Sequence, residues 1–207
     1  KRQAATIRKS TDNSAQLFLS DVHIDLLTTH KTQYNREQYN IHIRYGFHST
    51  HFGRCLIGMN KDRICWLSFV DNGDQHALNA LENKWSNATL SMEPLIGSEF
   101  ICLFNPRYQM DETKKVPLLM TGTDFQIEVW RKLIHIAAGK VVTYQYIARE
   151  LGRPNAARAI GNAIGNNPIA ILVPCHRVIT STGTIGGYRW SAERKQSLLA
   201  LECMYLK

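Results

Sequence analysis

The sequence lacks the features of a membrane protein and of a disulfide-rich secreted domain. None of its 207 residues lies in an apolar run of about 18 residues, so no transmembrane helix and no membrane partner are expected. The five cysteines are an odd number without regular spacing, which predicts neither a disulfide framework nor a Cys-x-x-Cys metal site. We therefore expect free thiols, no bound metal, no cofactor and a reducing, cytoplasmic setting. The chain begins at Lys1 rather than Met, which leaves a longer parent protein or a removed leader open.

Negative charge is scarce in the second half of the chain. The net charge is +8, with 14 Lys and Arg against 12 Asp and Glu in residues 1–120, but 11 against 5 in residues 121–207. A basic domain favours a polyanionic partner, nucleic acid first, although charge alone does not reject an ordinary basic protein.

Changes in pattern divide the chain into four segments. Residues 1–40 are polar and predict a tail or linker with room for one short strand. Residues 41–112 alternate short apolar runs with Gly and Asn, which indicates a small antiparallel sheet, and they predict a helix over Gln75–Asn87. A linker over 113–120 then leads to a second domain over 121–207.

The second domain has helical periodicity and contains a helix-turn-helix pattern. Two short helices joined by Gly152-Arg153-Pro154 have this form, and the basic balance favours DNA binding over an ordinary helical hairpin. We therefore predict an all-α DNA-binding domain. Its expected helices run from a Thr123 or Asp124 cap to Gly139, over Tyr144–Leu151 after a Thr143 cap, over Ala156–Gly165 after an Asn155 cap, and over Ser191–Leu206.

An apolar run that ends in a cysteine is the strongest candidate for chemistry. Ile169–Arg177 reads Ile-Ala-Ile-Leu-Val-Pro-Cys-His-Arg, and Pro174 interrupts regular hydrogen bonding. Cys175 is then fixed at the edge of a core beside His176 and Arg177, whose positive charge would favour the nucleophilic thiolate. A buried structural cysteine with solvent-facing neighbours is an equally good interpretation of these residues alone.

Ordered motifs extend through the whole second half of the chain. They are Gly122–Gln126 with Val129-Trp130, Thr143–Gln145, Ala156–Gly161, Asn167-Pro168, Pro174–Ile179, and Gly183 with Gly187–Trp190. Together they resemble the O6-alkylguanine-DNA alkyltransferases, also called methylated-DNA–protein-cysteine methyltransferases. The resemblance is strong over residues 121–203 and holds in outline over 41–105. The Gly-Tyr-Arg-Trp form is similar to bacterial members, and the amino-terminal half resembles the repair portion of the adaptive-response regulator.

The resemblance implies DNA repair by direct reversal of damage. Such a protein moves an alkyl group, typically methyl, from O6-alkylguanine, and also from O4-alkylthymine, in duplex DNA to Cys175, irreversibly and once per molecule. The implied fold is an RNase-H-like α/β domain followed by an all-α helix-turn-helix domain that carries this cysteine. The implied protein is a monomer that enters the minor groove, rotates the damaged nucleotide into a pocket, and associates with the nucleoid.

The resemblance also assigns catalytic roles to five residues. Cys175 would accept the alkyl group, and His176 would be the general base that acts on the thiol through a water molecule. Glu202 would orient His176, as in a catalytic triad, although alone it would be interpreted as a solvated helix residue. Tyr144 would donate to N3 of the flipped guanine, and Asn167 would hold the helix-turn-helix against the cysteine loop.

Further residues are assigned to DNA and to the pocket. Arg158 would fill the space that the flipped base leaves, with a phosphate contact as the alternative. Trp190 would narrow the guanine pocket unless its ring points away. Other expected DNA contacts are Thr143, Tyr144, Ala156, Ala157 and Gly161, and the expected pocket wall comprises Val178, Tyr188, Arg189 and Trp190.

Two other functions compete with repair as interpretations of the sequence. A DNA-binding sensor related to the same family lacks the acceptor cysteine, so the presence of Cys175 argues against it. A Cys-His hydrolase or thiol transferase for small substrates is disfavoured by the helix-turn-helix pattern and the basic second half.

Overall fold

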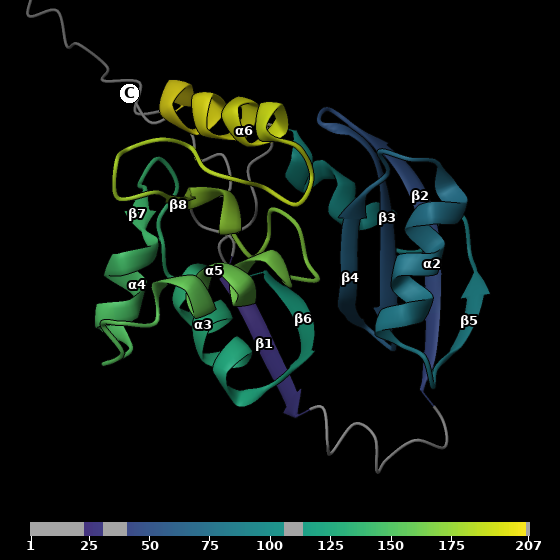
Figure 1. Cartoon of the computed structure of the whole chain (residues 1–207). Helices are drawn as coiled ribbons and strands as arrows, with labels where there is room; N and C mark the ends of the chain where they lie inside the picture. Colours follow the sequence, from purple (N-terminus) through teal and green to yellow (C-terminus); the bar gives the residue numbers. More distant parts are fainter. Residues whose placement is uncertain (1–22, 31–40, 106–113, 206–207) are drawn as a thin grey trace, which may run out of the picture.

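The computed structural model describes residues 23–30, 41–105 and 114–205. A six-stranded sheet with the order β1-β6-β4-β3-β2-β5 forms one part of the molecule, and helices α3 to α6 gather beside β1 and β6 (Figure 1). The strands are β1 His23–His30, β2 His42–Thr50, β3 Gly53–Asn60, β4 Arg63–Phe69, β5 Thr89–Met92 and β6 Lys115–Gly122.

The sheet is mixed rather than antiparallel. Strands β2, β3 and β4 form the predicted antiparallel meander, but β1 pairs with β6, β2 with β5, and β4 with β6 in parallel. Parallel pairs need long connections instead of tight hairpins, so the local pattern of turns did not indicate them. The two central strands are buried almost throughout, as their continuous apolar runs require.

Both segments that the sequence assigned to tails or linkers contribute strands. Part of segment 1–40 forms β1, which is longer than the one short strand expected there, and the rest of that segment lies outside the described residues. Segment 113–120 is largely β6, with Leu26 opposite Leu118 in the β1–β6 register. The linker prediction for 113–120 is therefore wrong over Lys115–Met120, where the strand includes Pro117 although proline lacks a backbone donor.

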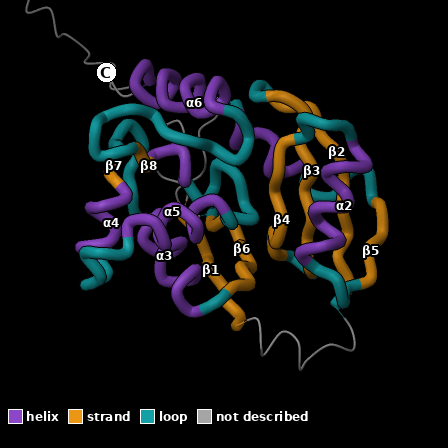
Figure 2. The backbone as a smooth tube through the Cα atoms, viewed as in Figure 1, coloured by secondary structure: helices purple, strands orange, loops and turns teal. Residues whose placement is uncertain are grey.

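The helices, coloured purple in Figure 2, lie close to the positions predicted for them. Thr123 forms a capping box with Gln126 at the start of α3, and the Thr143 hydroxyl accepts a bond from a backbone N–H at the start of α4. Asn155 is not a cap, because α5 begins one residue later and has Ala156 at its N-cap without a side-chain bond. The helices are α2 Asp74–Lys84, α3 Asp124–Ile134, α4 Tyr144–Glu150, α5 Ala157–Gly165 and α6 Ala192–Tyr205.

The second half is not entirely helical. Val142–Thr143 (β7) and Val178–Ile179 (β8) form a short parallel pair, which the sequence did not predict because each strand has two residues. Two 3₁₀ helices, η1 Ser98–Phe104 and η2 Cys175–Arg177, complete the described elements. Among the described residues, no helix is long and apolar enough to cross a membrane.

The sheet and the helical part share one hydrophobic core. Buried residues from β3, β4 and β6 pack in the same cluster as those of α3, α5 and the chain before Cys175. The backbone also connects the two parts, because Leu67 of β4 donates to the carbonyl of Pro168 at 3.0 Å and accepts from the N–H of Ala170 at 2.8 Å. The segment that leads to the cysteine is therefore attached to the central sheet.

Candidate active site

One asparagine organises the loop between α5 and the cysteine. Asn167 is fully buried, and its Nδ2 donates to the carbonyls of Ile169 and Val173 at 3.0 and 2.9 Å. The same Nδ2 lies 3.2 Å from Sγ of Cys175, while Oδ1 accepts from the N–H of Ile169 at 3.0 Å. The Asn167 side chain thus holds together both ends of the loop between α5 and Cys175.

The loop is strained at its centre. Ile171 has φ of 62°, in the left-handed region that β-branched residues rarely occupy, and its side chain is buried. Tight bonds join Leu172 to Ala170 at 2.6 Å and Cys175 to Val173 at 2.7 Å. Such a conformation persists where the surrounding packing over-determines it, so the position of Cys175 is imposed by its environment.

The Cys175 thiol is buried but borders a cavity of ≈ 280 Å³. Burial raises the pKa of the thiol, while the Asn167 hydrogen bond, the charge of Lys195 and the Tyr188 hydroxyl act in the opposite direction. The resting side chain is therefore a thiol that needs a base. The cavity is lined by Tyr144, Gly161, Ile164, Gly165, Cys175, Gly187, Tyr188 and Arg189.

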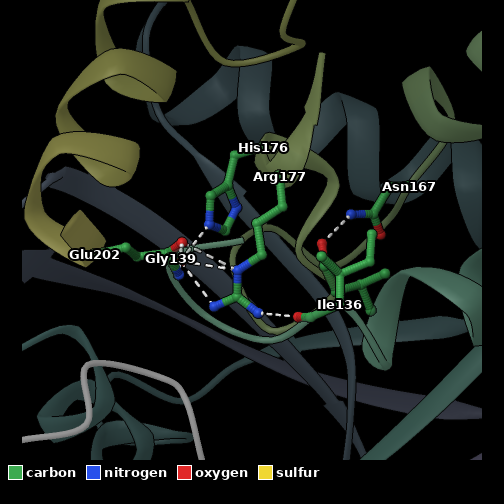
Figure 3. Close-up of polar contacts among 7 residues, drawn as sticks. Ile136, Gly139, Asn167, His176, Arg177 and Glu202 are labelled. Atoms are coloured by element: carbon green, nitrogen blue, oxygen red, sulfur yellow. Dashed lines mark hydrogen bonds and ion pairs between the residues drawn. The ribbon is translucent and has the colours of Figure 1, made fainter. Parts of the chain in front are cut away.

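His176 and Arg177 converge on one carboxylate from α6 (Figure 3). Nε2 of His176 lies 2.8 Å from Oε1 of Glu202, and all three side chains are buried. Arg177 donates to the same carboxylate through Nε and Nη2 at 2.7 to 3.2 Å, and through Nη1 to the carbonyl of Ile136 at 2.6 Å. The N–H of Gly139 supplies a further bond to Glu202 at 3.1 Å.

The protonation states of this group follow from its contacts. Burial alone would raise the pKa of Glu202, but hydrogen bonds and charge from His176 and Arg177 outweigh it and lower the pKa to about 2. Burial lowers the pKa of His176 despite Glu202, so the imidazole is neutral. Nε2 then carries the proton, and the buried Nδ1, which has no partner among the described residues, is a free base.

The positive charge beside the thiol does not come from its sequence neighbours. His176 is neutral, and Arg177 is occupied by Glu202 and Ile136, so the expectation that these two side chains charge the thiol directly is wrong. The charge comes from Lys195 on α6. The sequence alone could not show whether the charge comes from His176 and Arg177 or from a distant residue, because side chains adjacent in the chain can point in opposite directions.

Lys195 is a site residue that the sequence analysis missed. It is fully buried, and Nζ donates to the carbonyls of Val178 and Gly187 at 2.6 and 3.4 Å. Burial lowers its pKa to about 8, and its charge lowers the pKa of Cys175. Its spacing to Leu198 and Glu202, three and seven residues onward, places it on the buried face of α6 and could have revealed it.

Trp190 does not narrow the cavity. Its ring is 4% exposed and packs edge-on against Phe69 of β4 and against Tyr188, with centroids 6.4 and 5.4 Å away. The guanidinium of Arg189 lies over the rings of Trp66 and Trp190 at 5.5 and 5.6 Å. Tyr188 and Arg189 line the cavity, so the alternative that the Trp190 ring points away is the one observed.

The remaining sequence-predicted residues lie around the start of α4 and α5. Tyr144 lines the cavity, and its ring lies 3.8 Å from the position that a Cβ on Gly161 would occupy. Arg158 is exposed in the first turn of α5, next to Ala156 and Ala157, which are partly exposed. Val178 is fully buried in β8. Within the described ranges, no cluster of three His, Cys, Asp or Glu side chains could hold a metal ion.

The chain is similar in sequence to known DNA repair proteins. Residues 124–204 match the family described as 6-O-methylguanine DNA methyltransferase, DNA binding domain. The chain is 35% identical to the Escherichia coli bifunctional transcriptional activator/DNA repair enzyme Ada, over 79% of this chain and 46% of that protein. A Saccharomyces cerevisiae methylated-DNA–protein-cysteine methyltransferase is 50% identical over 38% of this chain and 42% of its own length.

A solved structure extends the similarity to most of the chain. The crystal structure of Mycobacterium tuberculosis OGT in complex with DNA has a TM-score of 0.63 and 32% sequence identity, covering 78% of this chain and 94% of that one. The chain spans about half the length of the first curated relatives it matches, 46% and 48% of them.

Proposed function

Because the chain belongs to the family of methylated-DNA–protein-cysteine methyltransferases, we propose that it repairs DNA by transferring the alkyl group of O6-alkylguanine to its own Cys175. The observation that carries the proposal is a buried thiol that borders a cavity, next to a neutral histidine whose other nitrogen is bonded to a buried carboxylate. This is the arrangement of nucleophile, base and orienting group that thiol activation requires.

In the proposed reaction each of these side chains has one role. Nδ1 of His176 takes the thiol proton, through a bridging water, and Glu202 stabilises the imidazolium that forms. The thiolate of Cys175 then attacks the alkyl carbon, the bond from carbon to O6 breaks, and its electron pair leaves with the guanine. Tyr144 donates a hydrogen bond to N3 and offsets that charge, and the thiol proton held by His176 passes through water to the purine, in place of the alkyl group. The product is a thioether, which thiols do not reduce, so each molecule acts once.

The same proposal assigns the DNA-binding surface. Helix α5 enters the minor groove, and the exposed Arg158 fills the gap left when the damaged nucleotide rotates into the cavity. Thr143, Ala156, Ala157 and Gly161 contact the DNA around it. Residues 41–112 act as an RNase-H-like domain and 121–207 as the acceptor domain. The five free cysteines fit a reducing compartment that holds the nucleoid.

Intact-protein mass tests the proposal directly. Incubation with a duplex containing O6-methylguanine should add one methyl group per molecule, located on Cys175 by peptide mapping. Cys175→Ala should bind the duplex and gain no mass. Binding of the wild-type protein without added mass would indicate a sensor, and turnover beyond one equivalent would indicate a hydrolase or thiol transferase; either result overturns the proposal.

A further inference from the structure

A buried hydroxyl beside the acceptor cysteine has no part in the reaction as proposed. The Tyr188 hydroxyl oxygen is buried and has no hydrogen-bond partner of good geometry among the described residues, although it lies close enough to Cys175 to lower the pKa of that thiol. Its ring lines the same cavity as Cys175, and an edge contact with Trp190 at 5.4 Å between centroids holds the ring in place. Leaving a buried hydroxyl unpaired is costly, so a state of the site that gives it a partner is favoured.

The Cys175 sulfur is the group that changes state next to this hydroxyl. Asn167 already directs an N–H at Sγ from 3.2 Å, which leaves room for a second donor on a sulfur that becomes charged. Tyr188 and Cys175 interact, and burial together with the cysteine charge raises the pKa of Tyr188 well above its ordinary value. The hydroxyl therefore keeps its proton and acts as a donor. A thiol is a weak acceptor and a thiolate a strong one.

We propose that Tyr188 is a further catalytic residue, whose hydroxyl donates a hydrogen bond to the Cys175 thiolate as it forms, so that Tyr188 and Asn167 together cradle the nucleophile. The inference rests on the proposed alkyl transfer for its purpose, but the hydrogen bond itself needs no DNA. No bond of Tyr188 breaks: its proton stays on oxygen, and the thiol proton goes to His176.

The other charged or titratable groups around the sulfur come from several elements. Lys195 reaches it from α6, Arg189 from the chain before α6, Tyr144 from α4, and His176 is its neighbour in the chain. A substitution that keeps the Tyr188 ring leaves all four in place. Tyr188→Phe therefore isolates the hydroxyl and retains the contact with Trp190.

The first measurement is the pH dependence of Cys175 alkylation by iodoacetamide, resolved by peptide mass so that the other cysteines do not contribute. Tyr188→Phe should raise the pKa of Cys175 by about 1 to 2 pH units, because a bond to a charged group favours the thiolate about 10- to 100-fold. Tyr146→Phe, at an exposed tyrosine of α4, should leave it unchanged. An unchanged Cys175 pKa in Tyr188→Phe would overturn the proposal.

The second measurement separates donation from simple packing. A less stabilised thiolate is scarcer but more nucleophilic, so methyl transfer by Tyr188→Phe should slow only about 3- to 10-fold at neutral pH. Above the pKa of Cys175 in both proteins, the rate of the variant should equal or exceed the wild-type rate, whereas a packing defect slows transfer at every pH.

If Tyr188→Phe does not fold, site-specific difluorotyrosine at this position should lower the Cys175 pKa instead, and a pKa that does not fall contradicts the proposal. If the wild-type protein accepts no methyl group, the proposed function is wrong. The pH dependence of iodoacetamide alkylation would still show whether Tyr188 donates to the Cys175 thiolate.

Discussion

At the scale of single residues, Glu202 receives more hydrogen bonds than any other side chain of the proposed site. Its carboxylate accepts from His176, from Arg177 and from the backbone of Gly139, and it is fully buried. One group thus sets the tautomer of the base and balances the charge of a buried arginine. These two roles can be separated experimentally, because the first depends on His176 and the second on Arg177.

Glu202→Gln should slow alkyl transfer by about 10²- to 10⁴-fold, the range of general-base effects, because the amide does not stabilise an imidazolium at His176. It also leaves Arg177 buried without its carboxylate, which costs about 3 to 5 kcal/mol of stability. Adding Arg177→Met should recover much of the stability but not the rate. Single-turnover kinetics and urea denaturation measure both, and recovery of the rate in the double variant would assign Glu202 a structural role only.

Acid should destabilise the protein through the same residues. The pKa of His176 is lowered by burial, so the unfolded chain binds a proton first as pH falls through about 6.5. Glu202, with its pKa lowered to about 2 from 4.5, contributes about 3 kcal/mol that is present above pH 4.5 and lost as pH falls toward 2. Urea denaturation between pH 8 and 2.5 should show this decline. The decline should be shallower in Glu202→Gln and unchanged in Glu82→Gln, an exposed control on α2.

Arg158 has two possible roles that differ in their signature. If its side chain fills the gap left by the flipped base, Arg158→Ala should slow repair in a duplex far more than reaction with free O6-methylguanine, because only the duplex needs unstacking. If it contacts a phosphate, the variant should bind any duplex more weakly and with a salt slope lower by about one. We expect the first outcome. Equal slowing on both substrates would mean that Arg158 supports only the fold.

At the scale of elements, α6 holds the cysteine turn and the pocket loop together. Lys195 bonds the carbonyls of Val178, directly after the turn, and Gly187, in the loop that lines the cavity. A buried lysine is costly unless its ammonium is satisfied in this way, and Lys195 lies in the first turn of α6. The helix therefore positions two walls of the site and supplies a positive charge that lowers the pKa of the thiol.

Lys195→Met should raise the pKa of Cys175 and slow transfer at neutral pH about tenfold or more, because it removes that charge and frees two carbonyls. In the wild-type protein the stabilisation of the Cys175 thiolate by Lys195 should decrease above pH 8, where Lys195 loses its proton. Iodoacetamide labelling of Cys175 across pH measures this, with Lys140→Met as an exposed control. A Cys175 pKa that does not move would show that Lys195 acts only through packing.

At the scale of the whole molecule, the sheet and the acceptor site are joined by aromatic and charged contacts. Arg194 of α6 pairs with Asp71 at 2.7 Å, and its guanidinium lies 4.2 Å from the centroid of Phe69. Phe69 in turn contacts Trp190, next to the residues that line the cavity. These contacts, with the backbone bonds of Leu67, predict that both parts unfold together.

Trp190→Ala should destabilise the protein by about 3 to 5 kcal/mol, because it empties a buried volume between the sheet and the cavity wall. Guanidinium denaturation followed by circular dichroism should show one transition for the wild-type protein and an earlier or split transition for the variant. Leu95→Ala, at a side chain that is 79% exposed, is the matched control and should change stability by less than about 0.5 kcal/mol. A variant as stable as wild type would contradict the interface described here.

Local pattern in the sequence was sufficient for the helices and the family, and it singled out Cys175 as the candidate acceptor. The caps at Thr123 and Thr143 act within one helical turn, so their residue types and spacing alone indicate where α3 and α4 begin. The motif around Cys175 also places His176 correctly, and its distance along the chain to Glu202 on α6 pairs the two as the resemblance implied.

Only the tertiary structure decided which buried groups face one another. Strands β1 and β6, the direction of the Trp190 ring, the role of Lys195 and the unpaired Tyr188 hydroxyl all depend on residues far apart in the chain. Periodicity shows that a side chain is buried but not what it meets there. The charge that acts on Cys175 depends on contacts of this kind. For this reason the residues next to Cys175 in the sequence did not indicate that the positive charge comes from Lys195.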